Sequence, residues 1–260
     1  MKLNLRILTL CVFIFGLAAC GGNPVIKPVP TVTIGLPVTP VPFYLTVTLG
    51  SIPYTESGTG PVYTIETNTP VLTNGNLDPR LGPFNDYMTA LVQQEIDAFK
   101  QNLQMASVEP IVGGSSLEIN FSQLSPQGNL LSLKFTIFFY FDGAAHPNTY
   151  SISATYDLEA GKMLVLADLF QPGTEYLSLI STYCLDELRA GPFGEALFEE
   201  GAQPTEENYA RWNITPEGLL ITFDPYQVTA YAAGPQLVVI PYSELQSIIE
   251  PQGPIGEFLP

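Results

Sequence analysis

Residues 212–249, WNITPEGLLITFDPYQVTAYAAGPQLVVIPYSELQSII, hold the only Trp of the chain and its densest set of short apolar runs broken by Gly and Pro. The residues of Thr215–Gly218 are typical of a turn, because Pro216 fixes φ and Gly218 tolerates a positive φ. Pro225 and Pro241 each end a strand, since Pro cannot donate to a ladder. The pattern therefore predicts strands at 212–214, 219–223 and 236–240, followed by a short helix that begins at Ser243.

Several separated motifs occur in order along this half of the chain. They are HPN at 146–148, YDL at 156–158 with Gly161-Lys162, DLF at 168–170, FDPYQV at 223–228, Ala230-Tyr231 with Gly234, and IPYSEL at 240–245. Together they resemble a bacterial extracytoplasmic domain family that forms the C-terminal part of the anti-sigma factor RsiV and also occurs in some cell-wall polysaccharide deacetylases. The resemblance runs from about Thr64 to Ile249, and it implies an RsiV-like C-terminal domain at residues 146–250.

Composition sets limits on the class of protein. The chain has 260 residues, of which 46% are hydrophobic, and this content excludes a disordered protein. The chain has nine basic and 25 acidic residues, which give a formal net charge of −16. Such a surface repels nucleic acid, which we exclude as a partner, and attracts basic partners or cations.

The first 20 residues read as a secretion signal. Lys2 and Arg6 form its charged region, and residues 7–16 form an apolar core too short to span a bilayer. The signal ends in Leu17-Ala18-Ala19-Cys20, which resembles the lipobox of bacterial lipoproteins, whose cysteine is lipidated before cleavage. We therefore expect a lipoprotein held on the extracytoplasmic side of the cell membrane by lipid on Cys20. The alternative is an ordinary signal peptide with a chance cysteine.

Two further features concern the anchor and the thiols. Residues 21–42 carry six prolines interleaved with Val and Thr, a composition that predicts an extended tether.

Cys11 leaves with the signal peptide and Cys20 is expected to be acylated, so no disulfide can form within the mature chain. Cys184 lies at helical spacing among Leu and Ile residues, which favours a small buried side chain over a reactive thiol.

Periodicity predicts the remaining elements. An apolar stripe predicts a helix over 83–103, and residues 175–189 predict a second helix with Thr174 as its cap. Clean alternation predicts strands near 117–122, 131–141 and 150–158, and looser patterns predict strands at 44–52 and 61–67. Strands with one buried face favour antiparallel pairing. We expect one α+β unit with a mainly antiparallel sheet, helices packed on one side, and two intimately joined halves at 43–145 and 146–250, followed by a tail at 251–260.

The chain offers little for catalysis. It has one histidine, His146, no G-x-S-x-G nucleophile motif, no multi-His or Cys-rich zinc set and no calcium loop. The deacetylases that share the resembling domain do their chemistry on a separate catalytic domain, whose histidine-rich metal set is missing here. We therefore expect no catalytic residues, no metal and no cofactor.

Aromatic residues in loops or on the second face of a strand are the best candidates for ligand binding, because aromatic groups beside acidic ones suit a protein interface or a sugar-stacking surface. The candidates are His146, Tyr226, Tyr231, Phe138 and Tyr140. The alternatives are that a helix covers these rings and that His146 only fixes its loop through a carbonyl.

The favoured function is non-enzymatic binding by a lipid-anchored surface protein. The resemblance to RsiV implies a sensor that binds lysozyme, a basic protein, and an acidic chain suits such a partner. Peptidoglycan fragments are the other expected ligand. One alternative is a cell-wall glycan hydrolase that uses an unidentified carboxylate pair, and another is a purely structural envelope lipoprotein.

Overall fold

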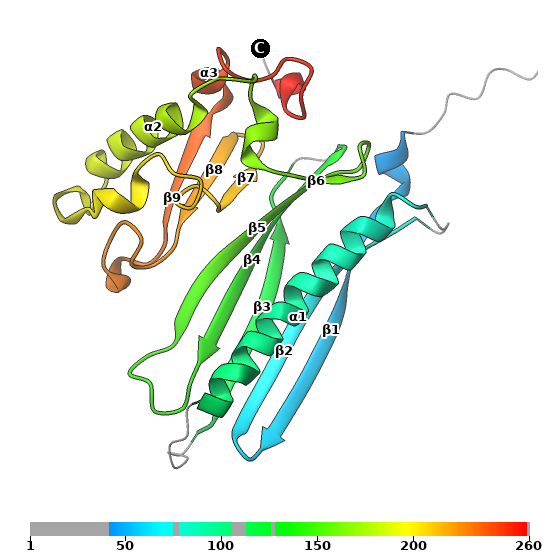
Figure 1. Ribbon diagram of the computed structural model, residues 1–260, viewed down its shortest axis with the longest axis vertical. Helices are drawn as coiled ribbons and strands as arrows, with labels where there is room; N and C mark the ends of the chain where they lie inside the picture. The colour runs from blue at the N-terminus through cyan, green and yellow to red at the C-terminus, as the bar shows by residue number, and fades with distance from the viewer. Residues whose placement is uncertain (1–41, 75–77, 106–112, 126–127, 259–260) are drawn as a thin grey trace, which may run out of the picture. The chain divides into compact units, whose positions relative to one another are not determined.

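The computed structural model describes residues 42–74, 78–105, 113–125 and 128–258. Helix α1 (Leu81–Met105) lies on one face of a six-stranded sheet, and helix α2 (Tyr176–Ala190) packs on a separate three-stranded sheet (Figure 1). Each sheet thus carries its long helix on one side. The expected α+β class is confirmed.

The six-stranded sheet runs in sequence order from β1 to β6. Its strands are β1 (Thr48–Thr59), β2 (Val62–Thr73), β3 (Ser115–Gln123), β4 (Leu130–Tyr140), β5 (Asn148–Asp157) and β6 (Lys162–Leu164). Neighbours pair antiparallel except β2 and β3, which run parallel because α1 crosses between them. The expectation of a mainly antiparallel sheet is therefore confirmed.

The apolar stripe of α1 faces this sheet. Seven apolar residues of this stripe are buried: Phe84, Met88, Leu91, Val92, Ile96, Phe99 and Leu103. Alternate residues of β3, β4 and β5 meet them from the sheet, among them Ile119 and Phe135, which are fully buried. We call this cluster the N-terminal core.

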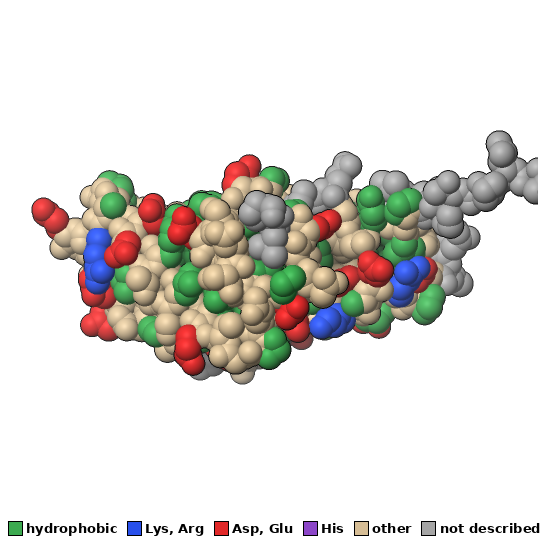
Figure 2. Space-filling view, turned by 90° about the horizontal axis from the view of Figure 1, so that it is seen from above, with side chains coloured by type: hydrophobic (Ala, Val, Ile, Leu, Met, Phe, Trp, Pro, Cys, Tyr) green, Lys and Arg blue, Asp and Glu red, His purple; other side chains and the backbone are tan. Residues whose placement is uncertain are grey.

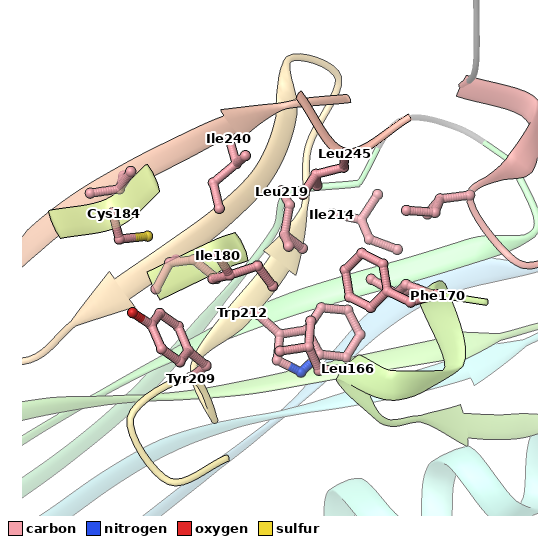
Figure 3. Close-up of a cluster of buried hydrophobic side chains, with 14 of the residues drawn as sticks. Leu166, Phe170, Ile180, Cys184, Tyr209, Trp212, Ile214, Leu219, Ile240 and Leu245 are labelled. Carbon is pink, nitrogen blue, oxygen red and sulfur yellow. The ribbon is translucent and has the colours of Figure 1, made fainter. Parts of the chain in front are cut away.

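The three-stranded sheet consists of β7 (Trp212–Ile214), β8 (Gly218–Phe223) and β9 (Gln236–Pro241), followed by the short helix α3 (Tyr242–Leu245). Gly218 begins β8 at φ 157°, where a Cβ would lie 2.2 Å from the carbonyl oxygen of Ile240. One face of the sheet packs on α2 around Ile180 and Cys184 (Figure 3). We call this cluster the C-terminal core. Short 3-10 helices complete the fold at 43–46, 166–169, 194–196, 199–202, 231–233 and 256–258.

The two sheets meet through their second faces. β7 contacts β4 and β5 on the side of the large sheet that α1 leaves open. Every residue of β8 is buried, on both faces of the strand. The reason is that Leu220 and Thr222, on the face opposite Ile221, lie against the six-stranded sheet rather than in water.

Several predicted boundaries differ from the observed ones. The division expected near residue 145 falls in the β4–β5 connection, inside the six-stranded sheet, and the change from one sheet to the other comes after β6. The first strand begins at Thr48, after a 3-10 turn, and Thr174 does not cap α2, because its hydroxyl donates to the carbonyl of Gln171. The predicted signal peptide, Cys20 and almost all of the tether lie outside the described residues. Within the described ranges, no helix is both long enough and apolar enough to cross a membrane.

Candidate functional site

A tight turn at the end of β8 presents Tyr226 to solvent. The amide of Gln227 donates to the carbonyl of Asp224 at 3.0 Å, with Pro225 and Tyr226 between them. Tyr226 has φ 72° and is the only non-glycine residue at positive φ among those described. This is the third position of a type II turn, where Gly or Asn is usual. Tyr226 is 58% exposed, so the strained backbone holds a large aromatic residue in water.

Contacts on both sides fix this turn. The side-chain amide of Gln227 donates to the carbonyl oxygens of Gly201 at 2.9 Å and Asn208 at 3.0 Å. Gly201 has no room for a side chain, because a Cβ would lie 1.9 Å from the carbonyl oxygen of Gln227. The turn is therefore held by the loop between α2 and β7, which compensates the unfavourable φ of Tyr226.

Three rings then line up at the end of the sheets. Tyr231 lies 5.4 Å from Tyr226, centroid to centroid, at 32° between planes, and 4.2 Å from His146 at 27°. The Tyr231 hydroxyl donates to the carbonyl of Pro147 at 2.6 Å, and Nδ1 of His146 lies 2.8 Å from the same oxygen. A carbonyl only accepts, so Nδ1 is the nitrogen that donates to it. We call His146, Tyr231 and Tyr226 the aromatic row.

The row joins segments that are distant in sequence. His146 comes from the β4–β5 connection, whereas Tyr226 and Tyr231 come from the β8–β9 connection. The remaining two predicted ligand-binding residues, Phe138 and Tyr140, lie half-buried on β4, on the face opposite α1. Among the described residues, no ring contact links them to the row. The structure thus brings together three of the five candidates.

A polar network behind the row holds Asp224 in place. The Nε of Arg211 lies 2.5 Å from the Asp224 carboxylate, and the backbone amide of Ser151 donates to both of its oxygens at 3.0 and 3.1 Å. Arg211 also donates to the carbonyl of Ser151 at 3.1 Å. The ion pair therefore completes the backbone hydrogen bonds of the free edge of β5, as a neighbouring strand would.

A second cation lies in the same interface. The ammonium of Lys134, on β4, donates to the hydroxyl of Thr222 at 3.2 Å. Burial lowers the pKa of Lys134, and Asp224 acts in the opposite direction. The sequence patterns did not indicate Arg211, Lys134 and Asp224 as a group. The available signal was the rarity of basic residues: in a chain with nine of them, a lysine inside an apolar strand indicates a specific partner.

The site suits binding better than bond cleavage. The Asp224 carboxylate is engaged by Arg211 and Ser151, so it is not free to act as a base at the row. Cys184 lies fully buried in the C-terminal core, where burial raises the pKa of its thiol to about 12. Within the described part of the chain, no group of three or more His, Cys, Asp or Glu side chains is arranged to hold a metal ion.

Part of the chain matches a known family model. Residues 167–243 match the family model of a protein of unknown function, DUF3298. The DUF3298 segment extends from the last 3-10 turn before α2 to the start of α3, so it contains Tyr226 and Tyr231 but not His146.

Two curated relatives extend the similarity. The peptidoglycan-N-acetylmuramic acid deacetylase PdaC of Bacillus subtilis is 26% identical over 196 residues, which are 74% of this chain and 40% of PdaC. The immunogenic protein MPT64 of Mycobacterium tuberculosis is 25% identical over 107 residues, 41% of this chain and 47% of MPT64. The chain thus spans less than half the length of these relatives. The predicted kinship with a domain found in cell-wall deacetylases is confirmed at this level, and the specific relation to RsiV stays a prediction.

Solved DUF3298 structures share the fold. One from Bacteroides fragilis superposes with a TM-score of 0.60 at 17% identity, covering 82% of this chain and 97% of that one. One from Pseudomonas aeruginosa gives a TM-score of 0.56 at 16% identity, covering 79% and 95%. At these identities the similarity shows the fold alone.

Proposed function

We propose that this protein is a non-catalytic binding protein of the cell envelope that takes cell-wall glycan on the aromatic row. Tyr226 carries the proposal. A fold that needed only a turn at this position would be more stable with glycine, whereas this chain keeps a large exposed ring in a strained conformation. Strain held at an exposed aromatic residue supports a role in recognition.

The chemistry of the row fits a sugar ring. Sugars have an apolar face of C–H groups that can stack on an aromatic ring, and hydroxyl groups that need polar partners. Tyr226 offers an exposed aromatic face, and the imidazole of His146 offers a polar group beside it. Similarity to part of a peptidoglycan deacetylase supports cell-wall glycan as the class of ligand.

The pKa shifts of the carboxyl groups favour binding over the alternative of a glycan hydrolase. A hydrolase needs one carboxyl group with a raised pKa to act as the acid. The described carboxyl groups with a shifted pKa, Glu56 and Asp78, are both shifted downward, because Lys100 and Arg80 respectively donate to them.

We also propose that lipid on Cys20 holds the protein at the membrane and that residues 21–42 let it reach the wall.

A basic protein such as lysozyme is the second candidate ligand. The observation that favours it is charge: 25 acidic residues outnumber nine basic ones, and acidic side chains are spread over the face in Figure 2 with few basic ones between them. Charge of this kind speeds association and weakens with salt, because the screening length is about 8 Å at physiological ionic strength.

Calorimetry of residues 42–260 distinguishes these ligands. The titrants are a peptidoglycan disaccharide oligomer and lysozyme, each at low and at physiological salt. We expect the glycan to bind at both salt concentrations and Tyr226→Ala to weaken it at least about fivefold, as expected for loss of one stacking contact. Tyr87→Ala is the matched control, because Tyr87 is an exposed tyrosine (43%) on α1, on the other face of the large sheet.

The outcomes separate clearly. Glycan binding that Tyr226→Ala and Tyr87→Ala change equally would exclude the aromatic row as the site. Lysozyme binding that survives physiological salt, with no glycan binding, would favour the second candidate. Lysozyme binding seen only at low salt would mean that the charge is generic.

A further inference from the structure

A pocket of about 90 Å³ lies between the C-terminal half of α1 and the six-stranded sheet, and none of its lining residues belongs to the aromatic row. α1 contributes Glu95, Ala98, Phe99 and Asn102, which share one helix face at spacings of three and four. The volume is well above the ~10–15 Å³ that one water molecule occupies by this measure. It can therefore admit a small ligand group.

Four rings wall the pocket in a connected set, which we call the aromatic cage: Phe99, Phe139, Phe141 and Tyr150. Phe99 and Phe141 stack at 5.3 Å with 19° between planes. Phe139 meets Phe141 edge-on at 5.5 Å and Tyr150 edge-on at 6.1 Å. Phe139, Phe141 and Tyr150 are only half-buried, so the cage is open to solvent on one side.

A carboxylate stands at this opening. The hydroxyl of Tyr150 donates to Glu95, and both burial and this contact raise the pKa of Tyr150, so the phenol keeps its proton. Glu56, the other carboxylate that accepts from tyrosine hydroxyls in this half of the fold, has Lys100 as its cationic partner. Within the described residues, Glu95 has no ion pair. Its charge is therefore uncompensated beside an aromatic cavity.

These elements together indicate what the pocket binds. Aromatic faces attract cations, most strongly those whose hydration is weak, and a nearby carboxylate adds direct charge attraction. A quaternary ammonium group meets both conditions, because its methyl groups contact the rings and its charge needs no hydrogen-bond partner. We propose that the cage and Glu95 form a binding site for a quaternary ammonium group. The acidic surface of the chain would further concentrate such a cation.

The first test compares two probes of the same shape on the full chain. Choline carries the charge, and 3,3-dimethylbutan-1-ol replaces its nitrogen with carbon. We expect choline to bind about tenfold or more tightly than the neutral alcohol in calorimetry. Equal binding of the two probes, or no binding of either, would overturn the proposal without the need for any variant.

Matched variants then locate the site. Glu95→Gln keeps the shape and the Tyr150 contact but removes the charge, and we expect it to weaken choline binding about tenfold. Asp97→Asn makes the same charge change on the exposed side of α1, and it should leave binding unchanged. Phe141→Leu should weaken binding, whereas Phe121→Leu, a half-buried ring outside the pocket, should not. Equal losses within either pair would refute the site.

A third experiment distinguishes the source of the quaternary ammonium group. Vesicles of phosphatidylcholine present the same head group on a membrane. Sedimentation of the wild-type chain with these vesicles, but not of Glu95→Gln, would support a lipid head group as the natural ligand. Choline binding without vesicle binding would support a free solute in the same site.

Discussion

Tyr226 shows the sharpest conflict between a residue and its backbone. At φ 72° a residue with a Cβ is strained by about 1–2 kcal/mol, while glycine is not. Tyr226→Gly and Tyr226→Ala both remove the ring, so they differ mainly in this strain. We expect the glycine variant to have a free energy of unfolding about 0.5–1 kcal/mol higher than that of the alanine variant. This gain is smaller than the strain itself, because glycine loses more conformational entropy on folding than alanine does. Urea unfolding measures the difference.

Ala232→Gly is the control, because Ala232 lies at an exposed position in a 3-10 turn at negative φ. There glycine should be less stable than alanine, opposite in sign to residue 226. An alanine variant at 226 that is as stable as the glycine variant would show that the turn relaxes. In that case strain would no longer support a functional role for Tyr226.

Single residues of the site were partly predictable. Tyr226, Tyr231 and His146 were identified from loop positions and from motif resemblance. Their stacking was not, because the rings come from connections about 80 residues apart and only the folded sheets bring them together. The positive φ of Tyr226 had no signal of its own, since the sequence places tyrosine where a type II turn usually has glycine.

The β1–β2 hairpin is tied to α1 by one carboxylate. Glu56 lies 2.6 Å from the ammonium of Lys100, and both Tyr54 and Tyr63 donate to it. These contacts, that of Lys100 first, lower the pKa of Glu56 from 4.5 to about 2. A lowered folded pKa means that the contribution to stability is complete above pH 4.5 and is lost as the pH falls toward 2.

We therefore expect the difference in free energy of unfolding between wild type and Glu56→Gln to shrink between pH 4.5 and 2, and to be constant from pH 5 to 8. Lys100→Met should show the same loss relative to wild type, because it removes the main cause of the shift. Urea titrations across this range measure both differences. A difference that persists unchanged to pH 2 would contradict the lowered pKa.

The free edge of β5 provides a second prediction for an element. Arg211 and Asp224 satisfy the backbone of Ser151, and the Asp224 side chain is only 9% exposed. Arg211→Ala leaves that carboxylate buried without its cation. We expect it to cost about 2–3 kcal/mol of unfolding free energy, somewhat less than for a fully buried pair because Arg211 is 31% exposed.

Lys162→Ala is the matched control, since Lys162 pairs with Asp168 at 3.4 Å on the surface. Its cost should stay under about 1 kcal/mol. Both values come from denaturant unfolding at neutral pH. Equal costs for the two variants would mean that water compensates Asp224 and that the edge of β5 does not depend on the ion pair.

Elements with strong periodicity were predictable, and exposed ones were not. α1 was found within two residues at each end, because its apolar stripe is continuous. β1 was misplaced, since most of its residues are exposed on both faces and alternate only loosely. Its position is fixed by pairing with β2 over 12 residues, and single-strand periodicity does not contain that information.

The boundary between the two cores needed the whole molecule. The family motifs begin at His146, so sequence placed the division there. Backbone pairing instead keeps β5 and β6 with the first four strands, because β4 and β5 form a ten-residue antiparallel ladder. The cores are then joined by buried polar contacts: Asn213 donates to the Ser132 hydroxyl at 2.9 Å and to the Leu133 carbonyl at 3.0 Å.

These contacts predict that both cores unfold together. Asn213 is fully buried, so separating the sheets would leave its amide and the groups that it satisfies without partners in a dry interface. Cys184 reports on the C-terminal core alone, because its buried thiol cannot react until that core opens. Phe135→Ala perturbs the N-terminal core alone, by about 3–5 kcal/mol.

If unfolding is cooperative, Phe135→Ala accelerates labelling of Cys184 in residues 42–260 by the factor that corresponds to its loss of global stability. Ile180→Val, in the same C-terminal core as Cys184, is the control. Its effect on labelling should match its loss of stability whether the two cores unfold together or separately. Labelling that Phe135→Ala leaves unchanged would mean that the C-terminal core opens independently. The polar interface would then hold the sheets in register without coupling their stability, and the DUF3298 segment could fold as a separate unit.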